Sequence, residues 1–399
     1  MNLQYLPKEL QIGIDIGSVN HSVAIGDGYG NPIQQFEIEH NTKGFNKLIS
    51  IIDKEAKERD AIVHVAMEGY NGWARPLDSI LLEKGYKLYN VNNVKLARFK
   101  EIFPAPQKSD RFDAQKILEL FSLQKHLPVA KKVLQEIMPF SNDNVKLKKL
   151  TRRRRQLVDE KVAISNRFST DLQAVCPELR AITNNIDSLR FLRFFTLKED
   201  IRELVKVTKT KILKINRLGE HYYNIIHQWQ KEAAFAAETE LIASMLYEDA
   251  TRILELKNRI KQLENEVRSL IPNSTIARVI DTIPGFSTVT AGELAGEIGN
   301  IERFKSEASL ALYIGMTNLN NDSGKKTGTK RNFSTNRHAK MAMTTAIMKH
   351  TQHVEQSKKY LEKKISEGKK YQQAIRSIGR HLVRVIWSMI QNDRDKGDR

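Results

Sequence analysis

Four acidic residues stand in contexts typical of a metal-dependent site for nucleic acid: Asp15, Glu68, Asp110 and Asp113. Asp15 and Glu68 each follow an apolar run that predicts a buried strand. Asp110 and Asp113 are spaced i,i+3 at the start of a helical pattern, so they share one helix face. Carboxylates held together repel one another unless cations lie between them. Because Mg²⁺ and Mn²⁺ prefer oxygen ligands, the set predicts a Mg²⁺ or Mn²⁺ site.

Such a site suits phosphodiester chemistry, which needs neutralised charge, an activated nucleophile and a stabilised leaving oxygen. Two cations about 3.5–4 Å apart supply all three. Two alternatives remain open at this point. The segment Gly13–Ser18 also resembles the phosphate-binding strand of actin-like ATPases and sugar kinases. Asp110 could serve only as a helix cap, because it lies where the helical pattern begins.

A serine on a basic, glycine-containing loop is the second chemical feature. Ser323 and Gly324 are followed by a series of cations: Lys325, Lys326, Lys330, Arg331 and Arg337. This composition predicts first a phosphate-binding loop, in which the serine hydroxyl only hydrogen-bonds a phosphate oxygen. A serine becomes a nucleophile only beside a base or a metal ion, and no triad is visible in the nearby sequence. His338 is a conceivable partner.

Composition predicts a folded protein with a polyanionic partner. The chain has 399 residues, of which 40% are hydrophobic and 28% charged, and its net charge is +18 at pH 7. The excess of cations favours nucleic acid over a membrane, and no apolar run reaches the roughly 18 residues of a membrane span. Cys176 is the single cysteine, which excludes an intramolecular disulfide. Because the N-terminus also lacks the layout of a signal peptide, we expect a cytoplasmic protein.

Strand-like and helix-like segments alternate between residues 10 and 125. The predicted strands are Gln11–Ile16, Asn20–Gly26, Pro32–Glu39, Ile62–Met67 and Lys87–Val91, and the predicted helices lie near 43–58 and 74–84. Strands that first follow one another and then alternate with helices predict an α/β domain with a mixed sheet of the ribonuclease-H type. We expect this catalytic domain to span residues 1–141, with Asp15 on its central strand.

The middle of the chain, residues 142–278, is rich in helix formers and predicts a helical domain. Its clearest pattern is a seam of a and d positions: Ala250, Ile253, Leu256, Ile260, Leu263, Val267 and Leu270. The seam predicts a coiled-coil arm about 30 Å long that ends near Leu270; the alternative is one helix packed inside a bundle. An earlier helix carries Arg152, Arg153, Arg154 and Arg155, whose local field predicts phosphate contacts.

The remainder, residues 279–399, predicts a third, mostly helical domain. Thr282–Ala291 resembles a helix-hairpin-helix, in which a turn bearing Gly285 lets backbone N–H groups approach a phosphate. The usual second glycine of that motif is Ser287 here, so the match is partial. Beyond residue 352 we expect a basic, mostly helical tail whose last residues, Asn392–Arg399, are disordered.

The order of these motifs resembles the DEDD transposases of the insertion sequence 110 family, whose relatives include the Piv-type DNA invertases. Asp15, Glu68 and Asp110-x-x-Asp113 correspond to the acidic residues of a RuvC-like N-terminal domain. The segments Ile283-Pro-Gly-Phe, Leu312-Tyr-Ile-Gly and Ser323-Gly-x-Lys look like parts of the family's C-terminal transposase domain. The resemblance covers residues 10–350, and the combination of motifs is specific although each motif alone is not.

The resemblance implies more than the residues themselves indicate. Members of this family are site-specific recombinases that move an insertion sequence, and a noncoding bridge RNA pairs with both donor and target DNA. In such a division of labour the protein reads RNA shape while base pairing reads sequence. The family's C-terminal serine, matched here by Ser323, attacks DNA covalently, and the carboxylates with Mg²⁺ complete a composite site. The resemblance further implies a bacterial or archaeal host and association with the nucleoid.

One departure from the family pattern concerns the loop after Ser323. The usual Ile-Ser-Lys-x-Gly-Asn/Asp-Arg is replaced by the shorter Phe333–His338, which lacks the glycine and leaves Ser334 as a competing nucleophile. A dimerising coiled coil would suit recombination, which holds two duplexes, so we expect a homodimer and a tetramer in the recombination complex. The rival interpretations are a RuvC-like junction nuclease that uses only carboxylates and water, an actin-like ATPase, and a non-enzymatic architectural protein.

Overall fold

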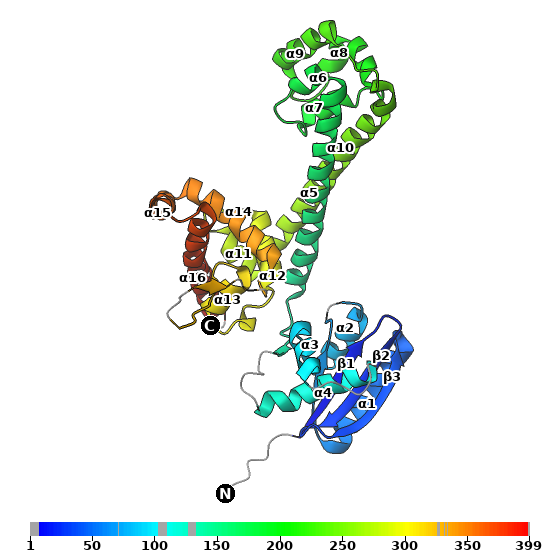
Figure 1. Ribbon diagram of the computed structural model, residues 1–399, viewed down its shortest axis with the longest axis vertical. Coiled ribbons are helices and arrows are strands. Elements are labelled where there is room, and N and C mark those ends of the chain that lie inside the picture. The colour runs from blue at the N-terminus through cyan, green and yellow to red at the C-terminus, as the bar shows by residue number, and fades with distance from the viewer. Residues whose placement is uncertain are drawn as a thin grey trace. The chain divides into compact units, whose positions relative to one another are not determined.

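The chain forms two compact units in the computed structural model, residues 1–139 and residues 140–399. The structure describes residues 8–70, 72–102, 110–126, 133–324, 328–330, 332 and 334–397 (Figure 1). The division between the units lies close to the first predicted domain boundary, whereas the predicted separation of a middle from a C-terminal domain stays a prediction.

The first unit is built on one six-stranded sheet with the order β3-β2-β1-β4-β5-β6. The strands are β1 (Glu9–Ile16), β2 (Asn20–Asp27), β3 (Pro32–Glu39), β4 (Ile62–Met67), β5 (Lys87–Val91) and β6 (Leu134–Glu136). β1, β2 and β3 are mutually antiparallel, β4 and β5 run parallel to β1, and β6 is antiparallel to β5. The predicted mixed sheet and its five strands are confirmed. The sequence analysis missed β6, because three residues carry too little pattern to identify a strand.

Helices cover both faces of this sheet. They are α1 (Thr42–Arg59), α2 (Arg75–Glu83), α3 (Asn93–Ile102) and α4 (Asp110–His126). α1 and α2 pack on the face that bears Ile12 and Ile14, whereas α4 packs on the opposite face. α4 lies so close to β1 that a Cβ on Gly13 would come within 2.4 Å of the Ala114 carbonyl oxygen. The small residue on β1 therefore sets how near α4 approaches the central strand.

The second unit contains a long pair of helices, α5 (Asn142–Val175) and α10 (Thr239–Leu270). At 1.5 Å per residue each helix is about 50 Å long. The predicted seam is buried on α10, from Ala250 to Val267, and α10 ends at Leu270 as predicted. α5 runs antiparallel to α10, since Arg154 pairs with Glu264 while Arg167 pairs with Asp249.

This arrangement corrects the expected use of the seam. Dimerisation through the seam requires that the seam be exposed to a second chain. In this structure α5 of the same chain covers it. Leu157 of α5 packs in one cluster with Leu256, Ile260 and Leu263. The physical reason is that α5 carries its own apolar positions opposite the seam, and pairing within one chain avoids the free-energy cost of association.

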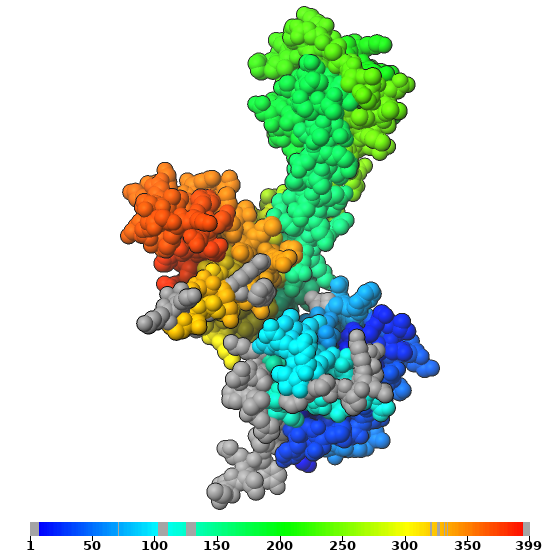
Figure 2. Space-filling view, in the orientation of Figure 1, coloured from blue at the N-terminus to red at the C-terminus, as the bar shows by residue number. Residues whose placement is uncertain are grey.

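Short helices form a separate core at the far end of the arm. They are α6 (Pro177–Ala181), α7 (Leu189–Phe195), η2 (Ile201–Lys206), α8 (Lys209–Leu213) and α9 (Gly219–Glu232). Their core is centred on Phe168, Phe191, Phe194 and Phe195, none of which is exposed to solvent. Figure 2 shows this tip, drawn in green, as a compact body at the end of the two-helix arm. Cys176 is buried in the same core, where it packs as a small apolar side chain.

The remaining elements pack around the base of the arm. They are η3 (Ile271–Asn273), α11 (Thr275–Asp281), α12 (Thr288–Ile298), η4 (Ile301–Arg303), α13 (Glu307–Ile314), β7 (Leu319–Asn320), β8 (Thr329–Lys330), α14 (Arg337–His353), α15 (Glu355–Ser366) and α16 (Tyr371–Gly397). The expected disorder after residue 391 is wrong for 392–397, which continue α16. Asp393 of α16 forms an ion pair with Arg278 of α11 at 2.7 Å, and this pair holds the end of α16 against α11.

Two glycines on α12 let it pack closely against the helix pair α5 and α10. A Cβ on Gly296 would lie 2.5 Å from the Lys148 backbone nitrogen, and one on Gly292 would lie 2.8 Å from a Val267 methyl carbon. The contact at Gly296 is with helix backbone, which cannot move aside as a side chain can. The helices therefore meet at a distance that only glycine permits.

We expect Gly296→Ala to lower the free energy of unfolding by about 1–3 kcal/mol, the usual cost of overpacking. This loss should exceed the gain in helix propensity that alanine brings. Denaturant unfolding of the purified protein measures the difference. Gly328→Ala is the matched control, because its Cβ would meet only the Asn321 carbonyl oxygen at 3.5 Å. Equal stability of both variants would contradict the tight crossing.

Candidate nucleic-acid-processing site

Asp15 and Glu68 lie at the carboxyl ends of two neighbouring parallel strands. Ile14 of β1 is in register with Met67 of β4, and the Glu68 N–H donates to the Ile14 carbonyl oxygen at 3.4 Å. Side chains alternate along a strand, so Asp15 shares the sheet face of Gly13, the face that α4 covers. Each acidic residue follows its strand as the sequence predicts, and the pairing of β1 with β4 brings the two strand ends side by side.

Asp113 comes to the same face from the first turn of α4. It directly precedes Ala114, whose carbonyl oxygen lies over Gly13 of β1. Its Oδ1 lies 3.0 Å from Nζ of Lys100 on α3. Sequence reasoning missed Lys100, since nothing in the pattern of α3 distinguishes it from the neighbouring cations. A cation that binds Asp113 through Oδ1 competes with this ammonium group.

The fourth acidic residue, Asp110, stands at the start of α4. Its side chain lies outside the described part of the structure. Among the side chains that are described, no group of three or more His, Cys, Asp or Glu residues could hold a metal ion. The donor chemistry of Asp15, Glu68 and Asp113 nevertheless fits Mg²⁺, because every candidate ligand is a carboxylate oxygen.

Ser323 lies near the end of a short β-hairpin. β7 and β8 pair antiparallel, with Leu319 opposite Lys330, and the Asn321 N–H donates to the Gly328 carbonyl oxygen at 2.8 Å. Ser323 is exposed, and Gly324 after it takes a φ of +56°, a conformation that favours glycine. The hydroxyl of Ser323 makes no hydrogen bond within the described part of the chain, so the described residues place no base beside it.

The other predicted phosphate contacts of this region fall into two groups. Lys330 on β8 and Arg337 at the start of α14 are both exposed, as a phosphate contact requires. Lys325, Lys326 and Arg331 lie outside the described residues. Ser334, the competing serine, is exposed, and its backbone N–H donates to Asn332 Oδ1 at 3.0 Å.

Asn336 anchors the chain that leaves the hairpin. Its Oδ1 caps α14 by accepting from the Ala339 N–H at 3.0 Å. Its Nδ2 lies 2.7 Å from both Glu297 Oε2 and the Tyr313 hydroxyl. One side chain therefore joins α12, α13 and α14 at the point where the hairpin returns to the core.

Glu297 is the buried acceptor at the centre of these contacts. Its side chain is 0% exposed, and Arg152 of α5 donates to it through Nε at 2.6 Å and Nη2 at 2.9 Å. Burial alone would raise the pKa of Glu297, but the hydrogen bonds from Arg152 and Asn336 and the nearby charge of Lys148 hold it below its ordinary value. The carboxylate is therefore ionised inside the fold.

A second buried carboxylate lies one turn earlier on α12. Arg155 donates to Glu293 at 2.9 Å, and the Glu293 side chain is 2% exposed. Burial raises the pKa of Glu293, although Arg155 opposes the shift. Sequence reasoning missed both glutamates. The available signal was the repeat Gly-Glu-Leu-Ala-Gly-Glu (292–297), which places two acids four residues apart on an apolar helix.

These pairs bear directly on the predicted arginine cluster. Arg152, Arg154 and Arg155 each pair with a glutamate of the same chain, whereas Arg153 is exposed and contacts only Gln156 within the described residues. Four consecutive arginines point in several directions around a helix, and three of them find carboxylates. A phosphate contact stays a prediction, and Arg153 is the member of the cluster best placed to make one.

Gly285 has a structural role in the turn between α11 and α12. Its φ is +86°, and a Cβ there would lie 2.3 Å from the backbone of His350 on α14. His350 Nδ1 also lies 2.6 Å from the Pro284 carbonyl oxygen. Two helices joined by a glycine turn are present as predicted, but close packing against α14 already explains the glycine. A phosphate at this turn stays a prediction.

Comparison with known proteins agrees with this architecture. Residues 12–177 match the model of the IS110 DEDD family, described as "Transposase". Residues 277–362 match the model described as "Transposase IS116/IS110/IS902 family". Together the two matches cover more than half of the chain. The chain belongs to the IS110/IS116 family of transposases. This membership indicates an enzyme that cuts and rejoins DNA.

Curated relatives of the family extend over nearly the full length. The chain is 22% identical to the "Insertion element IS116 uncharacterized 44.8 kDa protein" of Streptomyces clavuligerus, over 96% of this chain and 95% of that protein. It is 21% identical to the "Insertion element IS110 uncharacterized 43.6 kDa protein" of Streptomyces coelicolor, over 96% and 94%. A protein of insertion element IS900 from Mycobacterium paratuberculosis is 25% identical over 38% of this chain and 39% of its own.

The described helices also bear on a membrane association. None of the helices within the described residues is long and apolar enough to cross a membrane.

We expect Glu297→Gln to lower the free energy of unfolding at pH 7 by about 1–3 kcal/mol, because Arg152 and Asn336 lose a charged acceptor. A carboxyl whose pKa is lowered by folding stabilises the fold above its ordinary pKa of 4.5 and loses that contribution as the pH falls through its lower folded value. The variant should therefore show a smaller loss of stability between pH 7 and pH 3, measured by denaturant unfolding.

Glu264→Gln is the control for this prediction. Glu264 pairs with Arg154, but its side chain is 30% exposed, so its removal should cost no more than about 1 kcal/mol. Equal losses in the two variants would show that burial of Glu297 is not the source of the effect.

Proposed function

We propose that this transposase is a site-specific recombinase that cuts and rejoins DNA through a covalent intermediate at Ser323. The observation that supports this role is the position of Ser323. It is an exposed serine near the end of a hairpin, and the chain returns from that hairpin through Asn336, which is fixed to the buried Glu297. A nucleophile that acts on a large substrate must be accessible from solvent, and the segment that carries it must be held rigidly by the rest of the fold.

The proposed reaction is a transesterification at phosphorus. Ser323 Oγ forms a bond to the phosphorus atom as one bridging P–O bond breaks, and the released oxygen takes up a proton. A hydroxyl of the strand to be joined then attacks the same phosphorus, which restores the serine and closes the backbone. Each step exchanges one phosphoester for another, so no external energy source is needed.

The carboxylates of the first unit are proposed to complete the site. The strand order and the positions of Asp15, Glu68 and Asp113 support a RuvC-like domain that binds Mg²⁺ or Mn²⁺, with Asp110 as the remaining ligand. When bound, the ion would supply charge neutralisation at the phosphate. The attack by Ser323 also needs a group that accepts the hydroxyl proton, and we propose a carboxylate for this role.

The proposal also covers the partners. The net charge of +18 supports a bridge-type RNA alongside donor and target DNA, with base pairing supplying the sequence specificity. Exchange of strands between two duplexes supports a homodimer that forms a tetramer in the recombination complex. Because α5 covers the α10 seam, these contacts would use other surfaces. Light scattering of the nucleic-acid complex tests the tetramer, and a monomer there would contradict it.

We expect wild-type protein, incubated with its element's noncoding RNA, donor DNA, target DNA and Mg²⁺, to form a protein–DNA adduct that resists SDS. Ser323→Ala should abolish the adduct because it removes the attacking oxygen, whereas Ser334→Ala should retain it. Denaturing gel electrophoresis with labelled DNA measures both. Loss in Ser334→Ala alone would move the nucleophile to Ser334.

A metal-dependent nuclease is the second candidate, favoured by the absence of a described base at Ser323. It predicts cleavage without any adduct and full activity of Ser323→Ala. The same gel distinguishes the two functions, since free cleaved DNA and protein-linked DNA migrate differently.

Asp15→Asn should weaken binding of Mn²⁺ by at least tenfold, because even outer-shell changes at metal sites cost roughly 10–100-fold in affinity. Electron paramagnetic resonance of free Mn²⁺ measures this without any DNA. Asp53→Asn is the control, since Asp53 is occupied by Lys84 on the exposed surface of the same unit. Unchanged Mn²⁺ affinity in Asp15→Asn would remove Asp15 from the site.

A further inference from the structure

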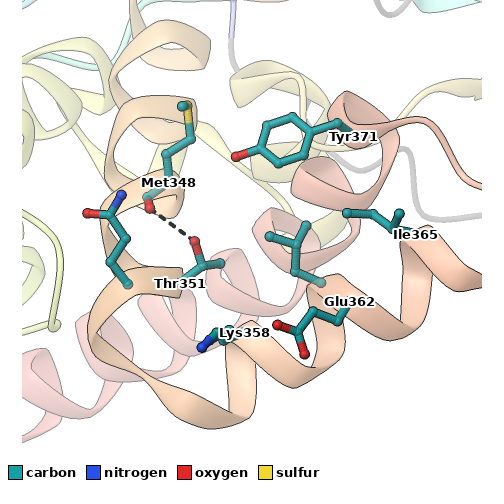
Figure 3. Close-up of a pocket in the computed structure, with 8 residues that line it drawn as sticks. Met348, Thr351, Lys358, Glu362, Ile365 and Tyr371 are labelled. Atoms are coloured by element: carbon teal, nitrogen blue, oxygen red, sulfur yellow. Dashed lines mark hydrogen bonds between the residues drawn. The ribbon is translucent and has the colours of Figure 1, made fainter.

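A groove separates three helices near the C-terminal end of the chain. It lies between α14, α15 and the start of α16, and its volume is about 480 Å³. This size falls within the roughly 300–1,000 Å³ of pockets that accept small molecules. Its lining includes Met348, Gln352, Lys358, Glu362, Ile365 and Tyr371. Figure 3 shows the Tyr371 ring pointing across the groove toward Met348.

Several large apolar side chains that line the groove are exposed to solvent. Met348 is 41% exposed, Ile365 is 45% exposed and Tyr371 is 43% exposed. α15 has no fully buried residue and is held to the core only by partly buried side chains such as Leu361. An aromatic ring and two aliphatic side chains therefore stay in contact with water around a single hollow, which is typical of a binding surface.

The segment that forms one wall of this groove carries a net positive charge, and its Lys358 lines the groove itself. Residues 355–371 contain six lysines and three glutamates. Lys359 and Lys364 pair with Glu355 and Glu367. The other four lysines have no ion-pair partner among the described residues: Lys358, Lys363, Lys369 and Lys370. Such a set of uncompensated cations favours a polyanion over an apolar protein surface.

We propose that this groove binds a single-stranded segment of DNA, with one unpaired base stacked on Tyr371 and its phosphates beside Lys358 of α15 and beside Lys369 and Lys370, which directly precede Tyr371. Grooves for single strands combine these two features, a cationic track and an aromatic face. The Glu362 carboxylate lines the same groove and can accept from an exocyclic amino group of the base. A second copy of the chain suits the groove poorly, because a self-complementary contact would bring lysines against lysines.

This inference rests on the proposed function, in which strands are opened for exchange. It adds a place where an opened strand is held apart from the reacting phosphate. The groove uses none of the carboxylates and neither serine of the proposed reaction, so its failure and the failure of that reaction are distinguishable.

The test is the affinity of the full chain for a short fluorescent single-stranded DNA, measured by anisotropy. Tyr371→Ala should weaken binding roughly 5- to 150-fold, the equivalent of one base–aromatic stack. Tyr371→Phe should restore it, because the ring remains. Tyr29→Ala is the matched control, since Tyr29 is an 86% exposed tyrosine of the first unit. Circular dichroism confirms that each variant is folded.

Photo-cross-linking of DNA that carries 5-iodouracil locates the base independently. Cross-links should map to peptides within 348–371 of the wild-type protein. Wild-type affinity in Tyr371→Ala, or cross-links confined to other segments, overturns the groove. A Tyr371 effect seen with RNA but not with DNA overturns the DNA assignment. If the Tyr371 and cross-linking experiments give negative results while the Ser323 adduct forms, only the proposed groove site is refuted. If no adduct forms, the covalent Ser323 reaction is refuted and the groove site is not.

Discussion

The fold of the second unit depends on one carboxylate that has no access to water. An isolated charge in a protein interior costs several kcal/mol, so Glu297 is tolerable only if its partners are held in place. Arg152 lies on α5, and Asn336 is the residue directly before α14. These requirements fix three segments that are far apart in sequence. The segment that leaves the Ser323 hairpin is held by this acid through Asn336, and also by hydrogen bonds from Asn332 and Thr335 to the Leu312 carbonyl oxygen.

The composition of α12 meets two opposing demands at once. Gly296 lets the α5 backbone come close and Gly292 leaves room for the Val267 and Leu147 side chains, whereas Glu293 and Glu297 need room for guanidinium groups. Spacing glycine and glutamate four residues apart places each pair along one stripe of the helix. Close packing shields the ion pairs from solvent, and the ion pairs in turn hold the helices in one register. Neither feature would be stable in this form without the other.

The sequence was informative where a pattern is local. Strand runs, the end of α10 at Leu270 and the positions of Asp15 and Glu68 directly after strand-like runs all follow from patterns within a few residues. The pairing of Arg152 with Glu297 spans 145 positions, and no local pattern reports such a contact. An arginine run has the same appearance whether its partners are phosphates or distant glutamates. The seam on α10 was likewise clear, but its partner was decided by apolar positions on α5 that periodicity alone did not single out.

The antiparallel arm has a consequence for how such chains diverge. The polypeptide enters the tip on α5 and returns on α10, so both ends of the tip lie at the same place. Adding or removing matched heptads in the two helices would change the reach of the arm while leaving the α12 contacts untouched. Residues 178–276, which include nearly all of the tip and the whole of α10, fall between the two family matches. The length of the α5–α10 arm can therefore change in evolution without any change in the residues proposed to act on DNA.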